Sequence, residues 1–426
     1  MRLYFEDIKV GEEYESPGRT VTESDIVVFA GLSGDYNVLH TDAEHMKSSL
    51  FGERIAHGLL VVAMQSGLLD RAMPPCAGLS PTGLKWRFKG PVKIGDTIRV
   101  RARVSGKREG TKPEWGLVTI ERRVLNRYVN PTNVCVLSCS FCDFARKKGE
   151  AGAFENSIED VLEMIKPGTR EAHIVGGHHP DWPFEYFERM IAAIHAARPE
   201  TQIKAFTAAE VDYWWRRWKI EPREALTRLK RAGLHSMPGG GAEIFSPRLA
   251  KLLRYSGKAD ADRWCEIHGI AHSLGIKTNA TMLYGHVETM DERVEHLLRL
   301  REQQDRSGGF LTFIPLAYQI GDTKLVQRQT PPTDDLRTIA ASRLLLDNFP
   351  HVEAYWVMIG QETASLALHF GASDVNGTLE DEKIAHMAKA ESPAGLAQEQ
   401  ILRMIRDAGK VPVERDALYN VVRVWN

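Results

Sequence analysis

Three cysteines, Cys135, Cys139 and Cys142, lie within eight residues of the sequence. The chain has 5 cysteines among 426 residues, too few for a disulfide scaffold, so this cluster predicts a metal or catalytic site in a reducing compartment. Three thiolates on one loop can hold three irons of a 4Fe-4S cluster and leave the fourth iron open to another ligand. The alternative is a zinc site completed by His173 or His178, although structural zinc sites usually use paired C-x-x-C hooks.

A carboxylate and an imidazole, Asp35 and His40, form a second candidate site five residues apart. On a tight turn these two groups can share one water and activate it for addition to a double bond. The alternative is that Asp35 caps a turn and that His40 is an ordinary hydrogen-bonded histidine. The spacing therefore predicts acid–base chemistry, with a purely structural role left open.

Glycines close three of the predicted strands, at residues 176–177, at residues 239–241 and at Gly285. Because glycine has no side chain, the backbone at these points can approach a ligand closely, although a tight turn would also explain each one. Parallel strands of a barrel end at one rim, where active sites lie. The three segments together predict a ligand site on that rim.

The composition excludes several classes of partner. The 55 Lys and Arg balance 56 Asp and Glu without long runs of one charge, so no basic surface for nucleic acid or anionic lipid is predicted. The N-terminus lacks a signal-peptide pattern, and the longest apolar stretch, near residues 58–69, is too short to cross a bilayer. We expect a cytoplasmic protein with a small-molecule substrate, in which the isolated Cys76 and Cys265 are inert.

The first 126 residues are rich in strand patterns. Residues 85–90, 97–104 and 117–124 alternate apolar and polar side chains, as a strand with one buried face does. Residues 56–69 form a helix that is apolar on nearly every face and must be covered on most sides. The pattern predicts an α+β unit, an antiparallel sheet around one helix.

The remainder alternates short strands with amphipathic helices. The predicted strands are residues 173–177, 202–207, 234–237, 277–283, 310–316 and 351–358. The predicted helices are residues 157–165, 184–197, 223–232, 261–274, 291–304 and 334–348. This repetition predicts parallel strands with right-handed crossovers, an α/β fold that closes partly or fully into a TIM-like barrel.

The C-x3-C-x2-C spacing with Phe141 before the last cysteine, followed by a βα barrel, resembles the radical SAM superfamily. The resemblance implies a 4Fe-4S cluster on the three cysteines, S-adenosylmethionine on the open iron, and an electron donor such as flavodoxin or ferredoxin. It also implies S-adenosylmethionine contacts from a set of five residues. They are Phe141, Gly176, Gly177, Glu210 and Gly285. The family has a Gly-Gly-Glu-like segment where this chain has Gly-Gly-His178. In this segment the resemblance therefore implies cofactor contacts only for the two glycines.

Several longer segments narrow the resemblance to the aminodeoxyfutalosine synthase family of menaquinone biosynthesis. They are Asn-Pro-Thr-Asn-Val-Cys at 130–135, Thr-Ala-Ala-Glu at 207–210, Gly-Gly-Gly-Ala-Glu at 239–243 and Gly-His-Val-Glu at 285–288. The related dehypoxanthine futalosine cyclase shares the last two segments but typically carries Ser-Pro-Pro-Glu at the second. The resemblance implies addition of an adenosyl radical to 3-[(1-carboxyvinyl)oxy]benzoate, giving aminodeoxyfutalosine.

That substrate carries two carboxylates, which need cationic or hydrogen-bond-donating partners. Five residues are candidates by their position near strand ends: His178, His179, Lys204, Asn279 and His286. Of these, His178 and His286 are the candidate catalytic residues of this domain.

The segment from Phe29 to His40, with Ala56-His57-Gly58 opening the apolar helix, resembles the MaoC-like (R)-specific enoyl-CoA hydratases, which have a hotdog fold. The resemblance implies that Asp35 and His40 are the catalytic pair and that a homodimer forms through this domain. Val38 stands where the family usually has proline.

The two resemblances predict domains at residues 1–126 and 127–426. Each domain lacks a segment at the shared boundary, because the hotdog's last strand and the synthase's strand upstream of Asn130 are both missing. The working activity is therefore expected to be the radical SAM transferase. A working hydratase with a vestigial barrel, or a scaffold with a structural zinc, is the alternative.

Overall fold

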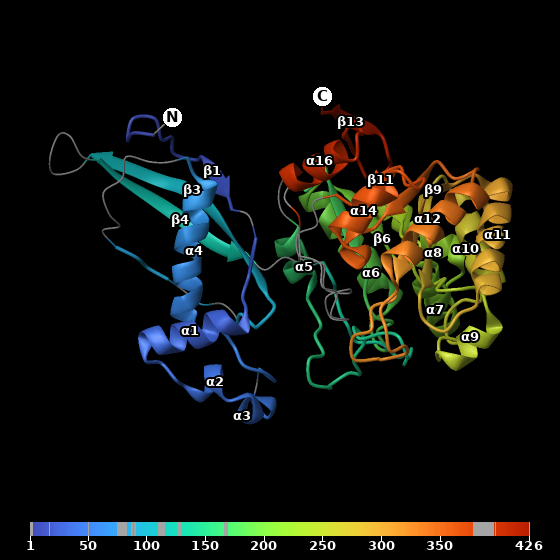
Figure 1. Cartoon of the computed structure of the whole chain (residues 1–426), viewed down its shortest axis with the longest axis horizontal. Coiled ribbons are helices and arrows are strands. Elements are labelled where there is room, and N and C mark those ends of the chain that lie inside the picture. Colours follow the sequence, from blue (N-terminus) through green and yellow to red (C-terminus); the bar gives the residue numbers. More distant parts are fainter. Residues whose placement is uncertain are drawn as a thin grey trace. The chain divides into compact units, whose positions relative to one another are not determined.

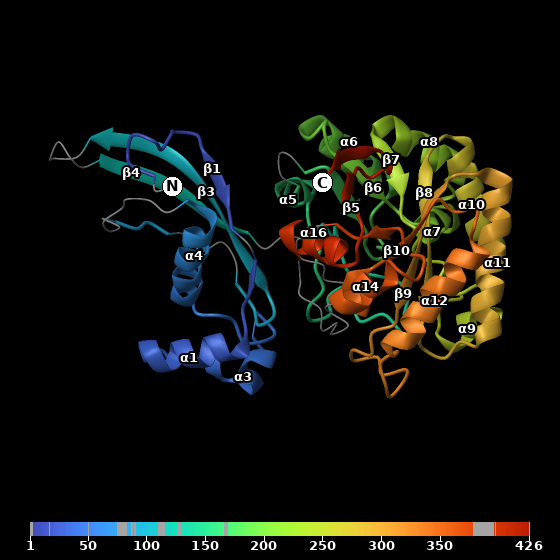
Figure 2. The ribbon, with the colours of Figure 1, turned by 45° about the horizontal axis from the view of Figure 1, so that its top comes forward.

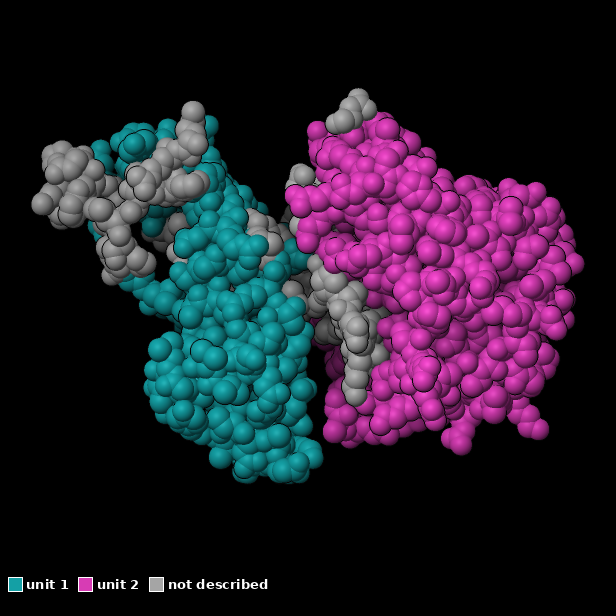
Figure 3. Space-filling model, viewed as in Figure 1, with its two compact units in different colours: residues 1–127 teal, residues 128–426 magenta. Residues whose placement is uncertain are grey.

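The computed structural model describes residues 3–16, 18–49, 51–74, 83–86, 88, 91–109, 116–125, 129–165, 169–377, 396 and 398–425. The chain divides into two compact units, residues 1–127 and 128–426, shown in two colours in Figure 3. Within the described parts, no helix is long and apolar enough to cross a membrane.

The first unit is an antiparallel sheet packed on one long helix (Figure 1). Strand β3 (Thr97–Glu109) pairs with three others, namely β1 (Glu13–Glu15), β2 (Arg19–Thr20) and β4 (Gly116–Leu125). The helices are α1 (Glu23–Ser33), α2 (Val38–Thr41), α3 (Ala43–Lys47) and α4 (Gly58–Ala72).

The core of this unit lies between β3 and α4. Ile98, Val100 and Ala102 alternate with exposed or half-buried arginines along β3, and they pack against a row of apolar side chains on α4 that includes Met64 and Leu68. A strand with one buried face produces this alternation. The predicted α+β unit is confirmed.

One predicted strand of this unit, residues 85–90, is wrong over the residues that the structure describes. Lys85, Trp86 and Phe88 are not in a strand, and Arg87, Lys89 and Gly90 lie outside the described residues. The Phe88 ring instead lies so close to Gly58 that a Cβ there would be 2.7 Å from it. Phe88 is nevertheless 56% exposed, so the apolar positions of this segment do not form the buried face that the alternation predicted.

The second unit is a curled sheet of seven parallel strands in the order β11-β10-β9-β8-β7-β6-β5. The strands are β5 (Glu171–Ile174), β6 (Gln202–Ala205), β7 (Leu234–Met237), β8 (Lys277–Tyr284), β9 (Phe310–Ala317), β10 (His351–Ala354) and β11 (Asp374–Val375). Strands that follow each other in the chain are neighbours, so all right-handed crossovers run on one side of the sheet. This confirms the predicted parallel α/β fold in its partial-barrel form.

Helices cover the outer side of this sheet, as α8, α10, α11 and α12 do in Figure 2. The helices are α5 (Ile158–Met164), α6 (Phe184–Ala197), α7 (Ala208–Trp218), α8 (Pro222–Ala232), α9 (Pro247–Leu252), α10 (Ala261–Ser273), α11 (Met290–Ser307), α12 (Pro332–Leu345), α13 (Trp356–Ile359), α14 (Gln361–Ala367) and α16 (Gln398–Asp407). A C-terminal hairpin, β12 (Val413–Arg415) and β13 (Val421–Val424), follows.

Two parts of this unit bear on the sequence predictions: the end of β10 and the segment before β5. The strand predicted at residues 351–358 ends at Ala354, because Tyr355 caps the short helix α13. Between residues 129 and 165, the described residues form isolated bridges, Thr132 with Glu155 and Val134 with Arg146, but no strand. The sheet therefore begins at β5, after the cysteine segment.

Candidate active sites

The cysteine loop lies at the C-terminal end of β5. Its backbone is held on both sides, since Cys135 N–H donates to the Arg146 carbonyl at 2.9 Å and Val136 N–H to the His178 carbonyl at 3.0 Å. The Lys147 ammonium closes the loop by donating to the carbonyls of residues 135, 136 and 137 at 3.0, 3.0 and 2.6 Å. The loop is thus fixed by its own backbone before any metal binds.

Gly176 and Gly177 allow this loop to rest on the strand end. A Cβ on Gly177 would lie 2.2 Å from the Val134 carbonyl oxygen, and one on Gly176 would lie 3.2 Å from the Thr132 carbonyl oxygen. Gly177 N–H also donates to Thr132 at 3.0 Å. Gly177 is required by the loop's own backbone, whereas Gly176 leaves only a close contact there. This role was not apparent from the sequence, and it is compatible with cofactor contacts.

The three thiols are partly buried and free of disulfides. Burial raises the pKa of Cys139 to about 11 and raises that of Cys142 as well, while the nearby Lys258 lowers both. The protonated thiols of Cys139 and Cys142 are therefore favoured without metal, and metal binding must displace their protons.

The spacing of the sulfurs bears on the choice between zinc and a cluster. A single zinc at about 2.3 Å from each sulfur would hold the sulfurs about 3.8 Å apart. Among the described residues, only Asp35, His40 and His57 bring three such ligand atoms within 4.8 Å of one another. The three thiols do not all lie within 4.8 Å of one another in the metal-free chain, so no site for a single ion is preformed at this loop.

A buried ion pair lies beside the loop. Lys258 Nζ is 2.5 Å from Glu243 Oε1 and 5.2 Å from the centroid of the Phe141 ring, which also meets Tyr255 edge-on at 5.9 Å. A Cβ on Gly257 would be 2.6 Å from the Leu137 side chain, so this segment packs directly on the loop. Lys258 and Gly257 were not predicted as part of the site. The available signal was Glu243, the ion-pair partner of Lys258 and the last residue of the Gly-Gly-Gly-Ala-Glu motif.

Two other predicted cofactor residues have local structural roles. Buried Glu210 accepts from Thr207 N–H at 2.6 Å in the capping box of α7, and burial raises its pKa to about 7. Gly285 has φ of +86°, and a Cβ there would be 2.0 Å from Thr330 Oγ1. Their contacts with a cofactor stay predictions.

The predicted histidines differ in how their nitrogens are used. His178 is buried and stacked on Tyr213 at 5.1 Å, and its Nδ1 has no partner among the described residues. His286 Nε2 donates to the Leu283 carbonyl at 3.0 Å, and its Nδ1 lies 3.0 Å from Glu288 Oε2, in a buried pair. Both nitrogens of His179 are likewise used, toward Glu155 and two backbone N–H groups.

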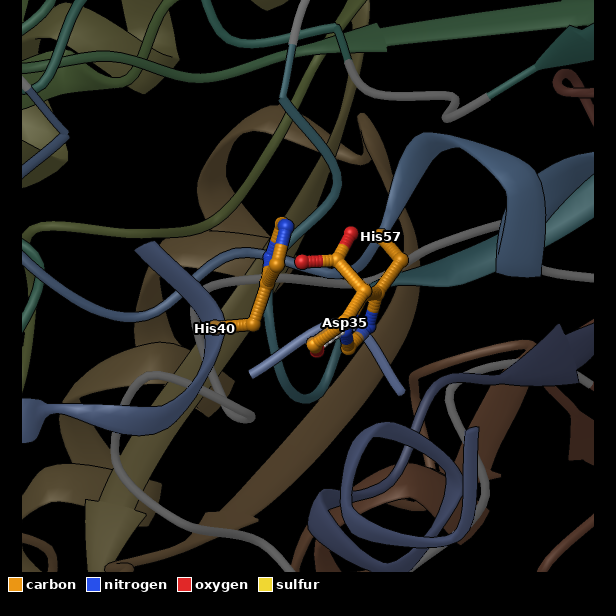
Figure 4. A group of neighbouring side chains, drawn as sticks. All are labelled: Asp35, His40 and His57. Atoms are coloured by element: carbon orange, nitrogen blue, oxygen red, sulfur yellow. Dashed lines mark hydrogen bonds between the residues drawn. The ribbon is translucent and has the colours of Figure 1, made fainter. Parts of the chain in front are cut away.

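In the first unit, Asp35, His40 and His57 meet at the start of α4 (Figure 4). His40 Nδ1 donates to the Ile55 carbonyl at 2.7 Å, which leaves a lone pair on Nε2. His57 Nε2 donates to the Asp35 carbonyl at 2.9 Å, and the two imidazoles stack at 3.8 Å. Asp35 is exposed and both histidines are buried.

The structure thus brings the predicted pair together and adds a third residue. His57 holds the Asp35 backbone and supports the ring of His40, so the arrangement offers a fixed base next to an accessible carboxylate. His57 was not predicted as a site residue, because its contact with Asp35 joins residues 22 positions apart in the sequence.

Comparison with known proteins agrees with this division. Residues 7–124 match the MaoC-like domain, residues 129–300 the radical SAM superfamily, and residues 307–425 the CofH/MqnC C-terminal region. The partial barrel with its cysteine loop therefore makes this chain a radical SAM enzyme, and the first unit is a MaoC-like domain. A 4Fe-4S cluster and S-adenosylmethionine are its cofactors.

The relatives identify the family more narrowly. The aminodeoxyfutalosine synthase of Thermus thermophilus is 46% identical over 307 residues, covering 70% of this chain and 82% of the relative. The one from Streptomyces coelicolor is 42% identical over 71% of this chain and 82% of the relative. The solved structure of methylornithine synthase (PylB), 15% identical, covers 68% of this chain and 82% of that chain with a TM-score of 0.52 and shares the fold. The chain belongs to the aminodeoxyfutalosine synthase family.

Proposed function

We propose that residues 127–426 form a transferase that makes 6-amino-6-deoxyfutalosine from S-adenosylmethionine and 3-[(1-carboxyvinyl)oxy]benzoate, a step of menaquinone biosynthesis. The observation that carries this proposal is the loop with Cys135, Cys139 and Cys142, whose backbone packs directly on Gly177 after β5. When bound and reduced, the cofactors would supply a 5′-deoxyadenosyl radical. It would form a carbon–carbon bond with the enol-ether methylene carbon of the benzoate, and rearrangement through the aromatic ring with loss of the enolpyruvyl carboxyl group would then give the product.

The residues of this chain position the reaction and exclude water. In the proposal, Cys135, Cys139 and Cys142 hold the cluster. S-adenosylmethionine lies against Phe141, Gly176, Gly177, Glu210 and Gly285. Of the two candidate histidines, His178 has a nitrogen free for a ligand, so we assign substrate contact to His178 and a turn-stabilising role to His286.

The cluster needs an external electron, for which we propose a flavodoxin or ferredoxin as donor. We also propose a cytoplasmic location, since a low-potential cluster and free thiols require a reducing compartment. The exposed apolar side chains of α1, among them Val28 and Leu32 at 68% and 81% exposure, support a homodimer through the first unit.

The test of the transferase is anaerobic reconstitution of the full chain with iron and sulfide, followed by measurement of bound metal and of S-adenosylmethionine cleavage. We expect about four irons per chain and cleavage that depends on the benzoate substrate. Cys142→Ala should lose both, and the matched control Cys265→Ala, a buried cysteine of α10, should keep both. Zinc without iron in the wild-type chain would contradict the proposal.

A second candidate function belongs to the first unit, which we propose hydrates a short enoyl-CoA. The specific observation is the His40 tautomer, because its Nδ1 bond to Ile55 leaves Nε2 as a base beside the Asp35 carboxylate. The pair would activate one water for addition to the β-carbon and deliver its proton to the α-carbon. The water supplies both the hydroxyl group on the β-carbon and the hydrogen on the α-carbon, so no further reactant is needed.

This activity is measured with crotonyl-CoA by loss of absorbance of the conjugated double bond. Asp35→Asn should slow it by about 10²–10⁴-fold while leaving the cluster and product formation of the second unit unchanged. Equal hydration by wild type and Asp35→Asn would remove the second function, and its complete absence in the wild type would indicate a vestigial domain.

A further inference from the structure

The inner face of the curled sheet carries polar side chains on neighbouring strands. Register fixes this face, since directly paired residues of adjacent strands point to the same side. His173 pairs with Lys204, Lys204 pairs with Ser236, and Asn279 pairs with Thr312. Ser236 also pairs with Lys277, two residues before Asn279, which places Asn279 on the same face as Ser236.

The opposite face is the one that the helices cover. Ile203 and Ala205 of β6 belong to the large apolar core with the helices. Thr278 of β8 contacts His268 and His272 of α10 through its hydroxyl. Lys204, Ser236 and Asn279 therefore point away from the helices, into the hollow of the partial barrel.

Two of these polar groups have no partner. Ser236 Oγ and Asn279 Oδ1 lie in side chains that are 0% and 3% exposed, and neither atom is hydrogen-bonded within the described residues. The Ser236 hydroxyl can donate to a carboxylate directly, whereas Asn279 Oδ1 is an acceptor, so the Asn279 amide must turn about its Cβ–Cγ bond to present Nδ2 as the donor. Buried polar atoms are nearly always paired with protein, water or a ligand. Lys204, 5% exposed, bonds Glu171 at 2.7 Å with only one of its three hydrogens.

The charges on this face leave room for an anion. Glu171 is balanced by Lys204, and Asp374 is balanced by Arg415, whose Nη2 lies 2.5 Å from Oδ2. Glu353 accepts from Asn376 at 3.0 Å, and its pKa is raised to about 8 by burial and by Asp374, so it is mostly protonated near pH 7. An incoming carboxylate would thus meet an ammonium that it shares with Glu171, and no unpaired negative charge among these groups.

The polar residues of this face also lie close to the C-terminal rim of the sheet. Lys204 and Ser236 are each one residue from the C-terminal end of their strand, and Ser236 is three residues from Gly239 on the rim. Three residues of extended chain span about 10 Å. His173, on the same face of the edge strand β5, is exposed. A ligand anchored at Ser236 would therefore reach the rim that carries the cysteine loop.

From this geometry we infer that Lys204, Ser236 and Asn279 form the binding site for the benzoate carboxylate of the acceptor substrate. The reacting enol ether must lie at the rim next to the cofactors, so the carboxylate at the far end of the aromatic ring occupies the hollow below. The inference rests on the proposed transferase function and adds to it the residues that select an aromatic acid. Lys204 and Asn279 were predicted as carboxylate contacts, and Ser236 is new.

The test uses Ser236→Ala and Asn279→Ala in the full reconstituted chain. Removing an unpaired buried polar atom costs little folding stability, so both variants should fold. Each should raise the KM for 3-[(1-carboxyvinyl)oxy]benzoate at least about tenfold, because a hydrogen bond to a charged group is lost. The KM for S-adenosylmethionine should not change. Asn279→Asp, which places a carboxylate against the carboxylate, should be more damaging than Asn279→Ala.

A binding measurement gives a readout independent of turnover. Calorimetric titration of wild type and variants with the substrate and with its benzoate methyl ester forms a double-mutant cycle. Wild type should lose affinity for the ester, whereas Asn279→Ala should bind acid and ester almost equally. Ser342→Ala, a buried serine whose hydroxyl is bound within α12, is the matched control and should behave as wild type.

The possible results separate the two proposals. Unchanged KM and affinity in Ser236→Ala and Asn279→Ala, with an active wild type, would overturn this inference alone and indicate that ordered water satisfies these atoms. A wild-type chain that neither binds nor converts the benzoate would overturn the proposed function, and this inference with it.

Discussion

Replacing Gly177 with alanine should disable the cluster without touching a cysteine. The added Cβ would lie 2.2 Å from the Val134 carbonyl oxygen, 2.7 Å from its carbon and 3.0 Å from Cys135 Cβ. Because these atoms are backbone or adjoin it, no side chain can rotate away. The loop must retreat by about 1 Å to restore van der Waals contact, roughly twice the displacement of about 0.5 Å that a ligand constellation tolerates.

The expected magnitude follows from this displacement. Overpacking of this kind costs about 1–3 kcal/mol, which lowers the Tm by about 3–10 °C in a unit of this size. Iron retained after anaerobic reconstitution is the main assay, and we expect Gly177→Ala to keep less than half of the wild-type amount. Calorimetry of the metal-free chain measures the change in Tm separately.

Two other glycines serve as graded controls. A Cβ on Gly176 would meet its nearest atom at 3.2 Å, so Gly176→Ala should retain nearly all its iron. A Cβ on Gly257 would meet Leu137 Cδ2 at 2.6 Å, and because a leucine end can move, Gly257→Ala should be intermediate. Wild-type iron content and Tm in Gly177→Ala would refute the reasoning that the glycine exists to seat the loop.

Three further predictions concern charge, catalysis and pH. Lys258→Met removes a cation beside the cysteine loop and should lower the midpoint potential of the cluster, whereas Glu243→Gln should raise it; redox titration followed by EPR checks both signs, and shifts of the same sign would contradict this account. Asp35→Asn should slow crotonyl-CoA hydration by about 10²–10⁴-fold, and a smaller loss of rate would deny Asp35 an acid–base role. Burial lowers the pKa of His296 from 6.5 to about 4, so the neutral form is favoured by folding and stability is complete above about pH 6.5 and declines as the pH falls toward 4. His296→Gln should flatten the dependence of Tm on pH over that interval, and an unchanged slope would exclude His296 as a source.

Much of the fold could be predicted because period and length are local properties of the sequence. Helix α6 begins at Phe184 and ends at Ala197, as predicted from its apolar stripe, and β7 spans Leu234–Met237 as predicted. The strand at residues 85–90 was predicted wrongly over the described residues, because alternation of apolar and polar types does not guarantee a buried face, and Phe88 is 56% exposed.

The site was predictable where the chemistry resides in one short segment, and less so where it depends on distant contacts. Spacing alone singled out the cysteine triplet. Lys258 comes from a turn more than 100 residues later, and no local pattern brings it beside Phe141. Glu210 and His286 stay predictions for the site, and the structure shows that a capping box and a turn also explain them. A polar side chain at a strand end can hydrogen-bond either to the nearby backbone or to a ligand, so the residue type alone does not tell which of the two it does.

Mass spectrometry of the reaction product tests the central claim most directly. The reconstituted full chain, reduced anaerobically with S-adenosylmethionine and 3-[(1-carboxyvinyl)oxy]benzoate, should yield 6-amino-6-deoxyfutalosine together with methionine. Cys139→Ser should yield neither. Formation of 5′-deoxyadenosine alone by the wild type, with the benzoate recovered unchanged, would contradict the assignment of this chain as the transferase.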